Sequence, residues 1–207
     1  MKRLLICFLV LLASAVHTTA QTFHADSLRQ GDLLFAYDLR NNAITDVTEG
    51  KDNLPIDHVG IAVRQDSAWQ VLEAVHKGVR LTPLAEFCHN FSAKDGTPLV
   101  VIGRVTGDID IEASIGRAMK HIGKPYDFYF MPDDKEMYCS ELVQKSYADQ
   151  EGRLIFKPIP MSFHNLKGKI TRYWKRYYRR AGLSVPEGKD GSNPGDLSRN
   201  PRVRIIR

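Results

Sequence analysis

The chain has 207 residues and a formal net charge of +5 at pH 7. This length is sufficient to bury one hydrophobic core, and the charge is only mildly basic. Three cysteines are too few for a fold that depends on a disulfide framework.

The first twenty residues have the three parts of a secretory signal peptide. Lys2-Arg3 precedes the apolar run Leu4–Val16, and small residues lead up to Ala20. The run is short for a membrane span, and Cys7 lacks the small-residue context of a lipoprotein cleavage site. We therefore predict cleavage after Ala20 and export of residues 21–207, as one domain, to the periplasm or the extracellular space. An uncleaved signal anchor is the alternative.

Five apolar segments bounded by turn residues predict β-strands. They are Gly31–Tyr37, Ile56–Arg64, Trp69–Val75, Gly78–Leu84 and Pro98–Val105. Successive strands joined by short turns favour an antiparallel meander over alternating β-α-β units. The polar segment Arg40–Pro55, between the first two strands, is a loop long enough to have a function of its own.

After the fifth strand the apolar residues recur at helical spacing. Residues Asp110–Ile122 predict a helix that ends at Gly123 and Pro125. A second helix starts at Cys139 and carries Leu142, Val143 and Tyr147 at helical spacing. The fold class is therefore α+β, with an antiparallel sheet or small barrel flanked by helices.

The segment Lys167–Arg180 predicts a basic and aromatic helix. Its cations are Lys167, Lys169, Arg172, Lys175, Arg176, Arg179 and Arg180, and the residues expected to pack inward are Ile170, Tyr173, Trp174 and Tyr177. The cations then form either a merely solvated face or a contact with an anionic envelope surface. Export argues against nucleic acid as the partner.

Cys139 is a candidate nucleophile because it opens a helix. The unpaired N–H groups and the positive end of the helix dipole favour a thiolate at that position. A cysteine nucleophile also needs a base within reach. The alternative is that Cys139 is a small buried apolar residue.

His58 is the best placed base. It opens an apolar strand, and Gly60 nearby leaves room for a close approach. Glu73 is the only acid within the run Val71–Val75, and on an adjacent antiparallel strand its carboxylate can orient the imidazole. The alternatives are a histidine with an ordinary polar role and a glutamate that faces solvent.

The sequence offers no motif for a cofactor. It contains neither a G-x-x-x-x-G-K-[ST] nor a G-x-G-x-x-G segment, and no ligand spacing typical of a metal site. We therefore predict no cofactor and no metal. A disulfide between Cys88 and Cys139 is not expected, although export permits one.

Several short motifs resemble known cell-wall enzymes. Gly123-Lys124-Pro125-Tyr126-Asp127, followed by Tyr138-Cys139-Ser140-Glu141-Leu142-Val143, is similar to the nucleophile half of the NlpC-type endopeptidases. Asp57-His58-Val59-Gly60-Ile61-Ala62 resembles their histidine strand. Here the histidine precedes the cysteine, as in the circularly permuted papain-like amidases of the YiiX/YaeF group. Gly31-Asp32-Leu33-Leu34-Phe35 and Asn193-Pro194-Gly195-Asp196-Leu197-Ser198 resemble the first strand and closing segment of that group.

The resemblance implies a papain-like fold with a catalytic triad. Cys139 matches the nucleophile, His58 the base and Glu73 the third, polar member. Tyr126 matches a tyrosine that faces the nucleophile and helps to bind the oxyanion. Tyr138 stands where these enzymes usually carry aspartate, and we count it with Tyr126 among the oxyanion-binding or substrate-binding candidates.

The implied function is that of an exported cysteine hydrolase that cleaves an amide through an acyl-enzyme. The substrate is then a small peptide or acyl-amide, with a peptidoglycan stem peptide as the expectation from export. One alternative is a lipid-directed thioesterase or acyltransferase whose acyl groove is lined by Phe156–Phe163, a segment that otherwise belongs to the core. Another is a non-catalytic envelope-binding module.

Overall fold

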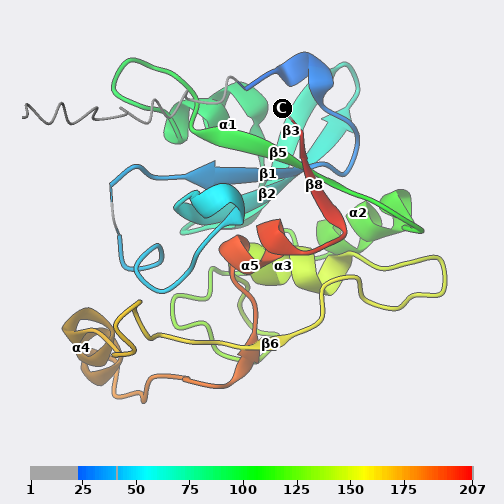
Figure 1. The fold of residues 1–207 in the computed structure, drawn as a ribbon. Helices are drawn as coiled ribbons and strands as arrows, with labels where there is room; N and C mark the ends of the chain where they lie inside the picture. Colours follow the sequence, from blue (N-terminus) through cyan, green and yellow to red (C-terminus); the bar gives the residue numbers. More distant parts are fainter. Residues whose placement is uncertain (1–22, 41, 207) are drawn as a thin grey trace, which may run out of the picture.

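One antiparallel sheet organises the computed structural model, which describes residues 23–40 and 42–206 (Figure 1). The predicted signal peptide, residues 1–20, lies outside the described residues. The strand order is β4-β3-β2-β1-β5-β8. The bounds are β1 (Leu33–Tyr37), β2 (Ile56–Gln65), β3 (Ala68–Val75), β4 (Gly78–Pro83), β5 (Val100–Val105) and β8 (Val203–Ile206).

Helices flank this sheet, which confirms the α+β class. They are α1 (Leu84–Asn90), α2 (Ile111–Met119), α3 (Cys139–Ser146), α4 (Arg172–Arg180) and α5 (Pro194–Arg199). The short turns η1 (Ala25–Ser27) and η2 (Lys51–Asn53) and a small hairpin of β6 (Ile159–Pro160) and β7 (Asp190–Gly191) complete the elements. Figure 1 shows α3 and α5 side by side beneath the sheet, with α4 beyond them. Within the described ranges, no helix has the length and apolar character that crossing a membrane requires.

The sheet is covered on both faces, and this explains the unbroken apolar run of β1. Leu33 and Phe35 belong to the larger core, which includes the inner side chains of α3. Leu34 and Ala36 belong to a second core, which includes Phe87 of α1. Because successive side chains of a strand point to opposite faces, a strand between two cores must be apolar at every position.

Helix α3 is held against the first strand by both packing and a hydrogen bond. Leu142 and Val143 are fully buried in the larger core. Just after the helix, the Tyr147 hydroxyl donates to the carbonyl oxygen of Gly31 at 2.7 Å. Gly31 has a positive φ of 75°, a backbone conformation that glycine adopts without strain. Gly31 therefore helps to dock α3.

Besides the short elements β6, β7, η1 and η2, the sequence did not predict α1, α5 and β8. Helix α5 begins with a clear cap, because the Asn193 side chain accepts from the Asp196 N–H at 2.7 Å and Pro194 occupies the first turn. The surrounding Gly, Pro and Ser residues concealed this signal. β8 extends the sheet by pairing with β5.

The basic helix α4 is shorter than expected, and its inner face is only partly the predicted one. It begins at Arg172, since residues 164–170 form a tight hairpin closed by a bridge between His164 and Ile170. Trp174 and Tyr178, one turn apart, are its buried residues. The prediction that Tyr173 packs inward is wrong, because its side chain is nearly half exposed.

The pair formed by Asp32 and Arg104 gives a test of fold stability. The Asp32 carboxylate is buried, accepts from the Arg29 N–H at 2.8 Å and pairs with the Arg104 guanidinium at 2.7 Å. Asp32→Ala leaves that guanidinium without its partner, so we expect a loss of about 3 kcal/mol in the free energy of unfolding, measured by urea denaturation. Asp38→Ala, which removes the exposed ion pair with Arg40, is the control. It should leave the urea concentration at the unfolding midpoint unchanged. Equal effects of the two substitutions would contradict this assignment.

Candidate active site

Cys139 is the first residue of α3, and its side chain is almost completely buried. Tyr138 precedes it with an extended backbone, and the Tyr138 N–H donates to the Glu141 carboxylate at 3.4 Å. The backbone N–H of Cys139 belongs to the first turn, where helical N–H groups have no partner inside the helix. The thiol and a free N–H donor are thus presented together at the start of the helix.

Tyr126 is brought to the cysteine by backbone pairing. It forms a bridge with Met137, supported by hydrogen bonds from the Asp127 N–H to the Met137 oxygen and from the Met137 N–H to the Pro125 oxygen. Burial raises the pKa of the Tyr126 hydroxyl well above its usual value, and the nearby charge of Cys139 acts in the same direction. Tyr126 therefore remains protonated and can donate a hydrogen bond beside Cys139.

A β-bulge directs His58. Ala36 of β1 pairs with His58, but the next residue, Tyr37, pairs with Ile56, so Asp57 is an extra residue in β2. Bulges of this kind change the direction of neighbouring side chains and are frequent beside active sites. The His58 side chain is buried, and its ring stacks on Phe91 with centroids 4.9 Å apart and planes inclined by 15°.

Glu73 of β3 holds the imidazole from the neighbouring strand. Its Oε2 lies 2.7 Å from Nε2 of His58, and its Oε1 accepts from the Thr82 hydroxyl of β4 at 2.6 Å. A Cβ built on Gly60 would lie 3.3 Å from the Glu73 Cβ and 2.4 Å from a Val71 methyl group. The absence of a side chain at Gly60 therefore leaves the space that these two residues occupy.

The electrostatic surroundings favour a protonated imidazole. Burial alone disfavours the charged ring, but interactions with Cys139 and Glu73 outweigh it and raise the pKa of His58 to about 10. Since Glu73 is bound at Nε2, Nδ1 is the ring nitrogen left for the thiol. The structure thus brings Cys139, His58 and Glu73 into one connected group, in which the imidazole interacts with both of the other side chains.

A mainly apolar pocket that is open to solvent lies beside Cys139. Its apolar walls come from the long loop, the segment before α3 and the α4 region, and they include Ile44, Val47, Phe130, Met161, Phe163 and Trp174. Asp57 is the only formally charged residue among those that line it, and burial raises the pKa of its carboxyl group. The pocket can therefore receive an apolar group next to the thiol.

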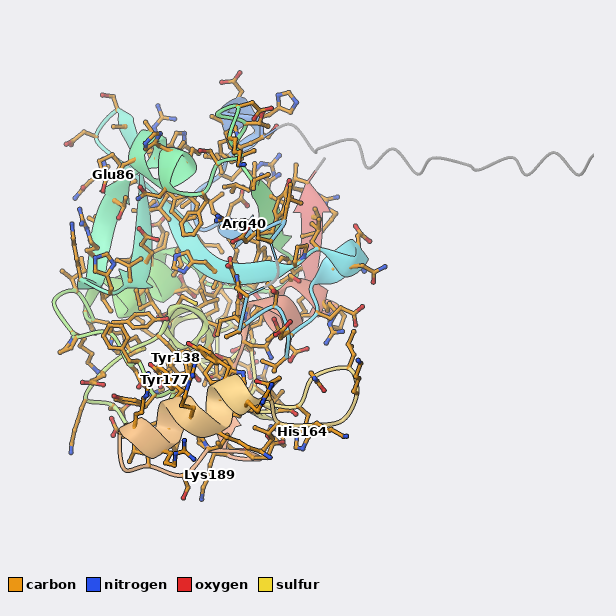
Figure 2. The ribbon with its side chains drawn as sticks, turned by 90° about the vertical axis from the view of Figure 1, so that its left-hand side faces the viewer. Arg40, Glu86, Tyr138, His164, Tyr177 and Lys189 are labelled. Carbon is orange, nitrogen blue, oxygen red and sulfur yellow. The ribbon has the colours of Figure 1, made fainter. Side chains whose placement is uncertain are left out.

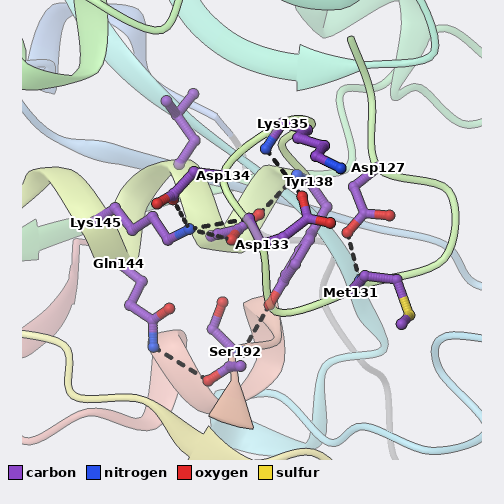
Figure 3. A network of polar contacts seen from close by, with 12 residues as sticks. Asp127, Met131, Asp133, Asp134, Lys135, Tyr138, Gln144, Lys145 and Ser192 are labelled. Carbon is purple, nitrogen blue, oxygen red and sulfur yellow. Dashed lines mark hydrogen bonds and ion pairs between the residues drawn. The ribbon is translucent and has the colours of Figure 1, made fainter. Parts of the chain in front are cut away.

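Tyr138 lines this pocket, but its hydroxyl has a structural partner. The oxygen accepts from the backbone N–H of Ser192 at 3.1 Å, and the adjacent Gln144 side chain donates to the Gly191 oxygen at 3.1 Å (Figure 3). Together the two bonds join α3 and the residue before it to the end of β7 and the residue after it. Tyr138 thus contributes its ring to the pocket wall, and its hydroxyl positions the closing segment.

Thr82 and Phe91 are residues of the site that sequence reasoning missed. Thr82 is the only residue of β4 with a hydroxyl group. It lies two residues after the position that pairs with Glu73, and this spacing could have indicated the contact between the two side chains. Phe91 follows α1, a helix that was itself not predicted, so nothing pointed to its stacking on His58.

The described residues contain no group of three or more His, Cys, Asp and Glu side chains arranged to hold a metal ion. Both cysteines in that part of the chain, Cys88 and Cys139, are free thiols. The chemistry open to this arrangement is nucleophilic attack by sulfur on a carbonyl carbon, with proton transfer by the imidazole.

Comparisons with known proteins agree with this fold. Residues 27–206 match the family described as permuted papain-like amidase enzyme, YaeF/YiiX, C92 family. The uncharacterized protein YiiX of Escherichia coli (strain K12) is 30% identical over 158 residues, which are 72% of each chain. A crystal structure described as metalloprotein YiiX of Escherichia coli O157:H7 has a TM-score of 0.67 at 24% identity, covering 86% of this chain and 96% of that one. The chain therefore belongs to the YaeF/YiiX family of permuted papain-like amidases.

Proposed function

We propose that this member of a cysteine hydrolase family is an exported amidase in which Cys139 is the nucleophile, His58 the general base and acid, and Glu73 the residue that orients the imidazole. The proposal rests on the contact between Nε2 of His58 and Oε2 of Glu73, which are 2.7 Å apart. Interactions with Cys139 and Glu73 also raise the pKa of the His58 imidazole. A signal-like segment at residues 1–20 supports export.

The reaction proceeds through a thioester. The Cys139 thiolate forms a bond to the amide carbon, and the oxyanion is met by the Cys139 N–H and the Tyr126 hydroxyl, each worth about 3 kcal/mol to the transition state. His58 gives its proton to the departing nitrogen as the C–N bond breaks. His58 then accepts a proton from water, the water oxygen attacks the thioester, and the thiolate is released.

Two substrate classes fit this chemistry. A cell-wall stem peptide follows from the proposed export and from the resemblance to cell-wall endopeptidases. An acyl-amide or thioester with an apolar acyl chain is the second candidate, and the apolar walls of the Cys139 pocket favour it. Met161 and Phe163, from the segment proposed as an acyl groove, are among those walls. A non-catalytic binding module has less support, because it has no need for the connected Cys139, His58 and Glu73.

Activation of the thiol can be tested by alkylation. At pH 7, iodoacetamide should modify Cys139 at least about tenfold faster than Cys88, since burial raises the pKa of the Cys88 thiol to about 11. Mass spectrometry of the digested protein measures both rates, and labelling in urea, where the two rates should converge, is the control. Equal and slow labelling of both cysteines in the folded protein would contradict an activated thiol at Cys139.

The role of Glu73 can be tested with Glu73→Gln. We expect kcat to fall roughly 10²- to 10⁴-fold, because the uncharged amide no longer stabilises the imidazolium. Glu73 also contributes to the raised pKa of His58, so the alkaline limb of the kcat/KM profile should move to lower pH. Glu86→Gln, at a half-exposed position on α1, is the matched control. Kinetic constants equal to those of the natural protein would contradict this role of Glu73.

Cys139→Ala should abolish turnover and leave the fold intact.

The two substrate classes can be separated with fluorogenic amides of increasing acyl chain length. If the acyl candidate is right, kcat/KM should rise about fourfold for each added methylene until the pocket is full, which corresponds to about 0.8 kcal/mol per buried group. A flat series, together with faster cleavage of stem-peptide amides, would favour the cell-wall peptide.

A further inference from the structure

The cations of the α4 region have no acidic partners. No Asp or Glu occurs between Glu151 and Glu187, and the seven cations from Lys167 to Arg180 fall within that interval. Among the described residues, none of the seven takes part in an ion pair, whereas Arg40, Arg80, Arg104, Lys145, Arg153 and Arg199 all do. This part of the surface therefore carries a positive field that the protein itself does not neutralise.

The helix separates its charged and aromatic sides. Trp174 and Tyr178 are buried in a small cluster with Met161 and Phe163, and the positions Arg172, Lys175, Arg176 and Arg179 are exposed. Figure 2 shows α4 at the molecular surface, with Tyr177 labelled on it and His164 at the hairpin that precedes it. The aromatic side of α4 therefore packs on the protein, and the cations lie on the side that faces solvent.

Apolar side chains are exposed next to these cations. Leu166, in the hairpin of residues 164–170, is 97% exposed and is followed directly by Lys167. Phe128 and Tyr173 are each 46% exposed and line an aromatic hollow. A soluble polyanion offers these side chains no apolar environment, whereas the headgroup region of a bilayer accepts both them and the cations.

The same region forms a wall of the catalytic pocket. Trp174 and Phe130 line both the aromatic hollow and the pocket that contains Cys139. α4 is therefore an element that the aromatic hollow and the Cys139 pocket share.

We propose that the face formed by α4 and the preceding hairpin, residues 164–180, docks the protein on an anionic lipid bilayer. The seven cations bind the acidic headgroups, and Leu166 enters the interface. Docking in this orientation places the Cys139 pocket next to the membrane, so that a membrane-borne acyl group can enter it without first dissolving in water.

The test is sedimentation of the chain from residue 21 onward with vesicles of phosphatidylcholine alone or with 30% phosphatidylglycerol, in about 0.1 M salt. We expect binding only to the anionic vesicles. Lys175→Glu/Arg179→Glu should weaken it at least about 30-fold, since each interfacial cation contributes a factor of about five. Lys77→Glu/Lys94→Glu, which changes the net charge equally at exposed sites elsewhere, should retain most of the binding. Leu166→Ser should weaken it several-fold.

Cleavage of a soluble fluorogenic amide should be unchanged in the α4 variants, and Cys139→Ala should bind vesicles normally, so docking and catalysis are measured separately. Several results would overturn the proposal. They are no preference for the anionic vesicles, equal losses in the two charge-reversal pairs, no loss in Leu166→Ser, or tighter binding to duplex DNA than to the vesicles at the same salt.

Discussion

The site depends on one buried carboxylate. Glu73 is inside a sheet that is covered on both faces, where an ionised group is costly unless its oxygens are bonded. His58 satisfies one oxygen and Thr82 the other, so three neighbouring strands must be in register for the charge to be accommodated. Gly60 leaves the necessary space opposite Glu73. The hairpins β2–β3 and β3–β4 are therefore fixed as much by this polar contact as by apolar packing.

The cysteine half of the site is built differently, on the start of one helix and one stretch of paired backbone. α3 is anchored at its far end by Tyr147 and at its near end by the Tyr138 hydroxyl, which meets the closing segment. Tyr126 arrives through its backbone bridge with Met137. The thiol thus lies where the start of α3 meets the inner strands of the sheet.

Much of this architecture was readable from the residues, and the gaps have identifiable causes. The strands could be recognised as apolar segments between turns. A single acidic residue within the apolar run of β3 indicated a buried polar contact. α1 follows Pro83 without a side-chain cap, so its start gave no signal. β8 carries Arg204 between apolar residues at the sheet edge, and its pairing with β5 joins residues about a hundred positions apart. The apolar character of the pocket was also hidden, because its walls come from distant parts of the sequence.

The separation of the two halves along the chain also affects how the protein folds. β2, β3 and β4 are joined by short turns, so His58, Glu73 and Thr82 can meet through contacts close in sequence, which form quickly. Cys139 joins them when α3 docks, and the bond from Tyr147 to Gly31 is one of the long-range contacts that hold this helix in place. A chain in which α3 has not yet docked therefore brings His58 and Glu73 together without Cys139.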